Sequence, residues 1–128
     1  MITLSLLKFL EDNNLGTIDV DLFWQKLSLG KVGIYITDIG SAQARGSRRS
    51  QRYEIYARGT SDPDGLARLN RVIELLNNSY DTCSLPPVPP VTTDSYKNVT
   101  IMPLSTPTSV GEDANGRIIW SASGELIY

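Results

Sequence analysis

Two short segments in which apolar residues recur at every second position constrain the fold of this chain more than any other feature. They cover residues 31–38 and residues 51–58. Successive side chains of a strand point to opposite faces of a sheet, so a period of two predicts two half-buried β-strands. Residues 39–50 between them are polar and contain glycine and serine, which predicts a loop. The whole unit is predicted to be a β-hairpin with a long, arginine-rich tip.

Two segments carry the periodicity of helices instead. Residues 2–13 place Leu6, Leu7 and Leu10 on one face, with Thr3 as the capping residue. Residues 62–78 begin with Asp62, a good N-cap, and Pro63, which suits the first helical position. The apolar residues of this second helix, Leu66, Leu69, Val72, Ile73 and Leu76, fall at helical spacing.

Residues 17–29 allow two interpretations. Ile18, Val20 and Leu22 alternate with aspartates, which is typical of a half-buried strand. Phe23 and Trp24 then open an apolar cluster that either belongs to the core or forms a contact surface for a partner.

The second half of the chain is divided by prolines. Residues 79–97 contain Pro86, Pro87, Pro89 and Pro90, which forbid a helix or a central strand there. We expect an extended connector, either a plain surface loop or an arm that lies on a neighbouring subunit. Strands are predicted at 98–104 and 117–128, with a turn at 113–116 and a bulge or bend at Gly124.

Together these elements predict one α+β domain over residues 1–128. Its sheet is antiparallel and four-stranded, or five-stranded if residues 18–22 add a strand, and two helices pack on one face. The chain has 41% hydrophobic and 20% charged residues, an ordinary globular composition. No segment is apolar enough to cross a membrane.

Composition argues against an enzyme. The chain has no histidine and one cysteine, so the commonest general base and the commonest metal ligand are missing. The glycines match neither the P-loop nor the dinucleotide-binding pattern. We therefore predict no catalytic residue, no metal and no cofactor.

The unusual charge feature is a cluster of arginines. Residues 41–60 have a net charge of +4, whereas the rest of the chain sums to −6. Arg45, Arg48, Arg49 and Arg52 lie in or beside the predicted loop. Because a guanidinium binds phosphates and carboxylates alike, this loop suits nucleic acid or an acidic protein neighbour, unless it is simply solvated.

The layout resembles the tail terminator proteins of long-tailed bacteriophages, which are also described as minor capsid proteins. The likeness rests on residues 32–36, on residues 51–59, on the helix from Asp64 and on the 111–117 turn before the last strand. It covers nearly the whole chain in layout.

The resemblance implies a homo-oligomer, a hexameric ring, at the head-proximal end of the tail tube in the virion, assembled in the host cytoplasm. Such a ring stops tube growth and offers a surface to the head connector. The expected partners are the tail tube protein and a connector or neck protein, with packaged DNA in the lumen as a further contact and no membrane.

The residues themselves suggest which parts make these contacts. The candidates are the four arginines, Phe23, Trp24 and the four prolines named above. Two other functions stay open: another head–tail joining subunit, such as a head-completion or neck protein, and a nucleic-acid-binding module that uses the arginine loop. The acidic remainder of the chain disfavours the last, because duplex binding usually needs a broader basic face.

Overall fold

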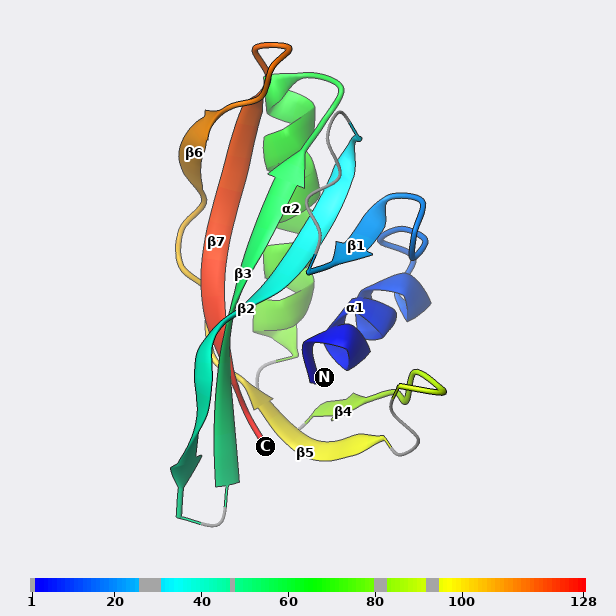
Figure 1. Ribbon diagram of the computed structural model, residues 1–128, viewed down its shortest axis with the longest axis vertical. Helices are drawn as coiled ribbons and strands as arrows, with labels where there is room; N and C mark the ends of the chain where they lie inside the picture. Colours follow the sequence, from blue (N-terminus) through cyan, green and yellow to red (C-terminus); the bar gives the residue numbers. More distant parts are fainter. Residues whose placement is uncertain (1, 26–30, 47, 80–82, 92–94) are drawn as a thin grey trace.

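The computed structural model describes residues 2–25, 31–46, 48–79, 83–91 and 95–128. In this part the chain is a mixed α+β fold with helices α1 (Ile2–Asp12) and α2 (Asp62–Asn78) and a seven-stranded sheet (Figure 1). The strands are β1 (Leu22–Trp24), β2 (Gly33–Arg45), β3 (Arg48–Arg58), β4 (Cys83–Leu85), β5 (Tyr96–Ile101), β6 (Thr108–Glu112) and β7 (Ile118–Ile127).

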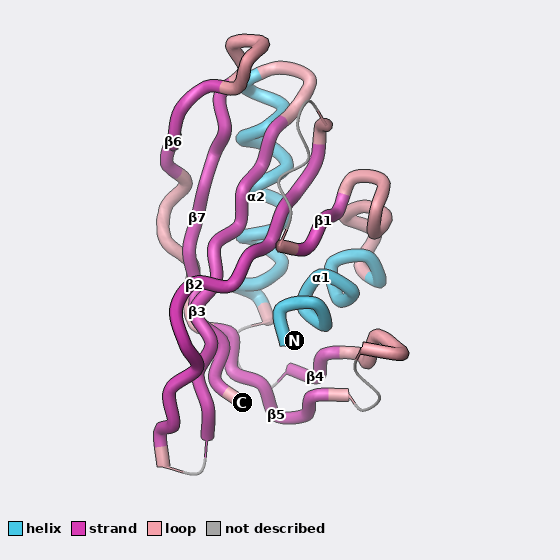
Figure 2. Tube along the Cα trace, in the orientation of Figure 1, coloured by secondary structure: helices cyan, strands magenta, loops and turns pink. Residues whose placement is uncertain are grey.

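The strands follow the order β1-β2-β3-β7-β5-β4, and β6 also pairs with β7. Strand β1 is parallel to β2, and the other pairs are antiparallel. One edge of β7 pairs with β3, while its other edge pairs first with β6 and, near the chain end, with β5. The sheet consequently curls into a half-barrel, with β4 and β5 turned away from the upper strands (Figures 1 and 2).

The predicted four- or five-stranded sheet is therefore wrong. The four strands expected from alternation are present as β2, β3, β5 and β7, but β1, β4 and β6 add to them. Strands β1 and β4 have three residues each, and every residue of β6 is exposed, so none of them shows a period of two. The strand expected at 18–22 is absent, because residues 17–21 form a turn in which Asp21 accepts a hydrogen bond from the Thr17 N–H.

Helix α1 closes the half-barrel. It contacts β1 and β2 near one end of the sheet and β4 at the other. Its Leu6, Leu7 and Leu10 side chains are fully buried in the common core. A fully buried leucine contributes about 1.5–3 kcal/mol relative to an exposed one, so this face holds the helix in place.

Helix α2 packs on β2, β3 and β7 through Leu69, Val72 and Leu76, as its periodicity predicts. Its N-cap is Ser61, one residue before the predicted Asp62, and the Ser61 hydroxyl accepts from the Asp64 N–H at 3.3 Å. Asp62 instead accepts a hydrogen bond from the backbone N–H of Ile118 at 2.8 Å. The carboxylate of Asp62 thus connects the start of α2 to the start of β7.

Gly124 does not mark a bulge. It pairs in register with Tyr53 on β3. A methyl group at this position would come within 2.7 Å of the Tyr53 hydroxyl oxygen, which is buried beneath it. Glycine is therefore required here by close packing rather than by a bend in the strand.

Candidate assembly surface

The arginine-rich segment is a β-ribbon and not a loop. Strands β2 and β3 continue to Arg45 and Arg48, and residues 43–45 pair with residues 48–50 inside the segment predicted to be unpaired. A bulge between Ile39 and Gln43, with Gly40 at a φ of 73°, interrupts the register. We call residues 39–52 the ribbon; its tip projects from the body beyond the C-terminus (Figure 1).

The structure divides the arginines of the ribbon into two kinds. Arg48 is half-buried and donates to the carbonyl oxygens of Asn98 and Ile127, the latter at 3.0 Å. Arg49 and Arg52 are exposed. Arg48 therefore fastens the ribbon to β5 and β7, whereas Arg49 and Arg52 present their charge to the surroundings.

The remaining arginine of this group is Arg45. Its backbone pairs with Arg48 at the end of the hairpin. Its side chain lies outside the described part of the structure. The backbone of Arg49 in turn exchanges two hydrogen bonds with Tyr128, at 2.6 and 2.8 Å, so the ribbon is tied close to its tip to the end of β7 and Tyr128.

Phe23 is buried and Trp24 is half-buried in the described fold. Phe23 is 6% exposed, and its ring stacks on Tyr35 at a centroid distance of 5.1 Å. The Trp24 indole donates to the Thr3 hydroxyl at 2.9 Å, and Thr3 donates to Asp38 at 2.6 Å. Of the two interpretations left open by the sequence, burial favours the core for this pair.

The prolines follow strand β4. Pro86 and Pro87 are half-buried, and Pro89 and Pro90 are exposed in a turn. The predicted connector at 79–97 thus includes one short strand, Cys83–Leu85, which pairs with β5. The turn that contains Pro89 and Pro90 lies between β4 and β5 in the chain.

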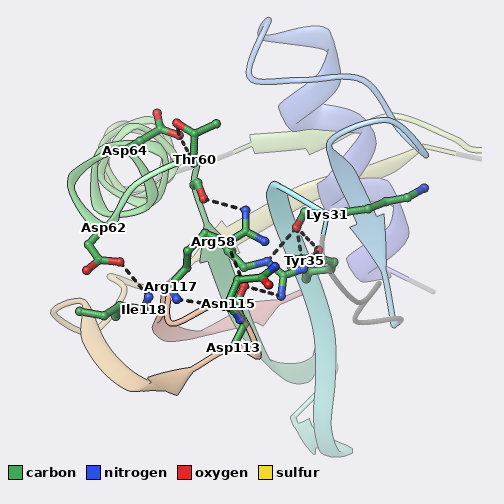
Figure 3. A network of polar contacts seen from close by, with 11 residues as sticks. Lys31, Tyr35, Arg58, Thr60, Asp62, Asp64, Asp113, Asn115, Arg117 and Ile118 are labelled. Carbon is green, nitrogen blue, oxygen red and sulfur yellow. Dashed lines mark hydrogen bonds and ion pairs between the residues drawn. The ribbon is translucent and has the colours of Figure 1, made fainter.

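A polar network that the sequence did not reveal joins three separate parts of the chain (Figure 3). Arg58, at the end of β3, is 2% exposed. Its guanidinium donates to the Lys31 carbonyl oxygen at 2.6 and 2.9 Å and to the Tyr35 hydroxyl at 3.1 Å, and it lies 3.5 Å from Asp113. Arg58 alternates along β3 with the buried apolar residues Ile55 and Ala57, and Asp113 of the 113–117 turn lies against its guanidinium.

Asp113 organises that turn. Its carboxylate accepts hydrogen bonds from the backbone N–H groups of Asn115 and Arg117, both at 2.9 Å, and from the Arg117 guanidinium at 3.0 Å. Arg117 also reaches the Gly59 carbonyl oxygen at 3.5 Å. The network therefore locks the β6–β7 turn onto the junction between β3 and α2, and it fixes the position of β6.

The stability of the protein is expected to fall in acid through Asp113. The Arg117 N–H, followed by the Asn115 N–H and the charge of Arg117, lowers the pKa of this carboxyl below its ordinary value of 3.8. A carboxyl with a lowered folded-state pKa stabilises the fold above its unfolded-state pKa, and this contribution is lost as the pH falls through the folded-state pKa.

We expect Asp113→Asn to lower stability at pH 7 and to flatten the loss of stability below about pH 4, the range where an unfolded aspartate titrates. Urea unfolding from pH 2 to pH 7 measures both effects. Asp19→Asn, at an exposed position, is the control. An unchanged pH profile for Asp113→Asn would show that this carboxylate is not the titrating group.

The described residues offer little for covalent chemistry. None of their histidine, cysteine, aspartate or glutamate side chains forms a group of three that could hold a metal ion. Burial raises the pKa of the Cys83 thiol, which disfavours the nucleophilic thiolate. No described helix has the length and apolar character needed to span a bilayer.

A hollow of about 390 Å³ lies on the face of the sheet opposite α2. Tyr35 and Tyr56, which are directly paired across β2 and β3, line it together with Val110 and Ile119. This lining is mainly apolar and holds no pair of catalytic groups. The projecting ribbon and the exposed strand β6 are consequently the features of this fold best suited to contact with other proteins.

In the comparisons with known proteins, no protein-family model and no curated protein matches the chain.

Proposed function

We propose that this chain is a structural subunit of a bacteriophage virion that forms a ring at the head-proximal end of the tail tube. There it stops tube growth and provides the surface for head attachment. The layout of helices and hairpins that resembles the tail terminators supports this proposal. The second candidate, another ring subunit of the head–tail joint, rests on the same features. Neither assigns a catalytic role to the chain.

The observation that carries the proposal is the ribbon. The exposed side chains of Arg49 and Arg52 lose rotamer freedom when they are fixed in a contact, which costs free energy. That cost is offset when each guanidinium meets a carboxylate, since a charged hydrogen bond contributes about 1.5–3 kcal/mol. Rings require one surface patch to meet a different patch on the next copy, and a projecting ribbon supplies such a patch.

The direct test is the mass and shape of the purified protein, alone and with tail tubes. Native mass spectrometry and electron microscopy should find a closed ring that also occurs at one end of the tubes. A protein that stays monomeric in both settings contradicts the proposal. Tubes of normal fixed length formed in its absence would contradict the terminator role and leave the neck-subunit alternative.

The arginines of the ribbon allow a sharper prediction. Arg49→Ser combined with Arg52→Ser should leave the melting temperature unchanged but weaken assembly about a hundredfold, if each lost contact contributes at least about 1.5 kcal/mol. High salt should weaken the wild-type assembly in the same direction, because it screens exposed charges.

Arg48→Ser is the matched variant, because its side chain binds within its own chain. We expect it to lower the melting temperature first and to affect assembly only through the loosened ribbon. Sedimentation across a concentration series measures assembly for both variants. If the double variant assembles like the wild type, the exposed arginines are not the contact.

A further inference from the structure

Strand β6 leaves one of its edges open. Thr108, Ser109 and Glu112 pair with β7, and β6 has no second partner strand among the residues that the structure describes. All five of its residues are exposed, and Val110 is 53% exposed. The strand contains neither lysine nor proline, and its one protective irregularity is the bulge between Ser109 and Glu112. Proteins usually blunt such edges, so β6 is well suited to accept another strand.

The polar network strengthens this interpretation. Asp113 follows β6 directly and is held by Arg58 and Arg117, so the edge is presented on a fixed support. A strand that accepts a partner with little ordering of its own loses less free energy on binding. The exposed edge of β6 is therefore rigidly anchored at its Glu112 end.

The ribbon has the shape and charge to pair with this edge. It is already a β-structure, and β1 covers only residues 34–36 of β2, so the ribbon half of β2 has an open edge in the described structure. The ribbon carries four arginines and no acidic residue, whereas Glu112 is exposed at the end of β6. The two features are thus complementary in backbone hydrogen bonding and in charge.

The same two features lie too far apart to meet within one molecule. The ribbon projects from one end of the long axis, and β6 lies toward the other (Figure 1). A contact between them must join two copies, with a different surface of each. Repeated contacts of this kind close a ring when the rotation between copies allows it.

We propose that the ribbon half of β2 in one copy adds as a strand to the open edge of β6 in the next copy. Main-chain hydrogen bonds supply the affinity, and the attraction between the ribbon arginines and Glu112 selects the register. This inference rests on the proposed ring and names the contact that builds it. It commits the β6 edge to a second copy of this chain and not to the tail tube or the connector.

The test uses two lysine substitutions. Lysine on an edge strand opposes the addition of a further strand, so Val110→Lys should weaken self-association at least tenfold. Val20→Lys is the control, because Val20 is 66% exposed and lies in the turn before β1, a strand that does not neighbour β6 in the sheet. Both variants should keep the wild-type melting temperature, and native mass spectrometry over a dilution series should show rings for Val20→Lys only.

Hydrogen exchange gives the second readout. In the wild-type ring, the amides of residues 108–112 and 40–45 should exchange more slowly than in the Val110→Lys monomer. Normal rings from Val110→Lys, or rings without this protection, would overturn the inference while the proposed ring stands. Protection that develops only with tail tubes would assign the edge to the tube and also overturn it. A wild-type protein that never associates would overturn both proposals.

Discussion

Arg58→Met is expected to lower the free energy of unfolding by about 3–5 kcal/mol, the usual cost of removing one partner of a buried charge pair. The Arg58 side chain is 2% exposed. It donates hydrogen bonds to the Lys31 carbonyl and the Tyr35 hydroxyl and forms an ion pair with the Asp113 carboxylate. Methionine fills a similar volume but donates no hydrogen bond. The Tyr35 hydroxyl and the Asp113 carboxylate would then remain buried with fewer hydrogen-bond donors, which leaves the cost of removing them from water partly uncompensated.

Arg58→Lys separates charge from geometry. Lysine keeps the positive charge but lacks the planar fork that reaches the Lys31 carbonyl and the Tyr35 hydroxyl at the same time. We expect an intermediate loss. Arg71→Met on α2 is the control, because Arg71 is exposed and its one described side-chain hydrogen bond goes to Ala67 of its own helix. Its effect should stay within about 0.5 kcal/mol.

Urea unfolding measures these differences, and hydrogen exchange locates them. Because Arg58 supports the 113–117 turn, the amides of that turn and of β6 should exchange faster in Arg58→Met than in Arg71→Met. Equal unfolding midpoints for the two variants would contradict the structural role assigned to Arg58.

Periodicity revealed the parts of the fold that have a buried face. Helices α1 and α2 and strands β2, β3, β5 and β7 each place apolar residues at a regular spacing toward one core, and each was predicted near its observed position. All residues of β6 are exposed, and among the ribbon side chains that the structure describes only Ser50 is buried. Strands of this kind show no apolar alternation, so the ribbon resembles a loop in sequence and β6 was not predicted at all.

The candidate site shows the same limit. Composition was sufficient to single out the arginine cluster. It was not sufficient to separate the arginine that binds within its own chain from those that are exposed. Arg48 is distinguished from Arg49 by acceptors on β5 and β7, about 50 and 80 positions away. Arg58 lies on the polar face of an alternating strand, and only the distant 113–117 turn buries it. Such partnerships depend on the tertiary fold, which local patterns do not encode.

Gly59→Ala is expected to lower the free energy of unfolding by about 3 kcal/mol or more, at the upper end of the range for an inserted methyl group in a packed site. Gly59 connects β3 to the start of α2. A Cβ atom there would press on the backbone nitrogen of Gly65 and come within 2.7 Å of the Asp64 carbonyl carbon. Backbone atoms in the first turn of a helix cannot rotate away as a side chain can.

The expected damage follows from the position of this glycine. Its carbonyl oxygen accepts from Arg117, and the adjacent α2 turn holds β7 through Asp62. Displacing α2 by even a fraction of an ångström would strain the network that supports the 113–117 turn and, through it, β6. We therefore expect Gly59→Ala to reduce self-association as well as stability.

Gly46→Ala is the matched comparison, because it separates backbone strain from collision. Gly46 has a φ of 64°, and a methyl group on its Cα would meet no atom within 4 Å, so alanine there costs only about 1–2 kcal/mol of left-handed strain. Gly59 lies outside that region of φ, and its cost comes from contact alone. Gly59→Ala could instead unfold at the same urea concentration as Gly46→Ala or at a higher one. In that case the junction between β3 and α2 accommodates a methyl group, and close packing there does not hold β6 in place.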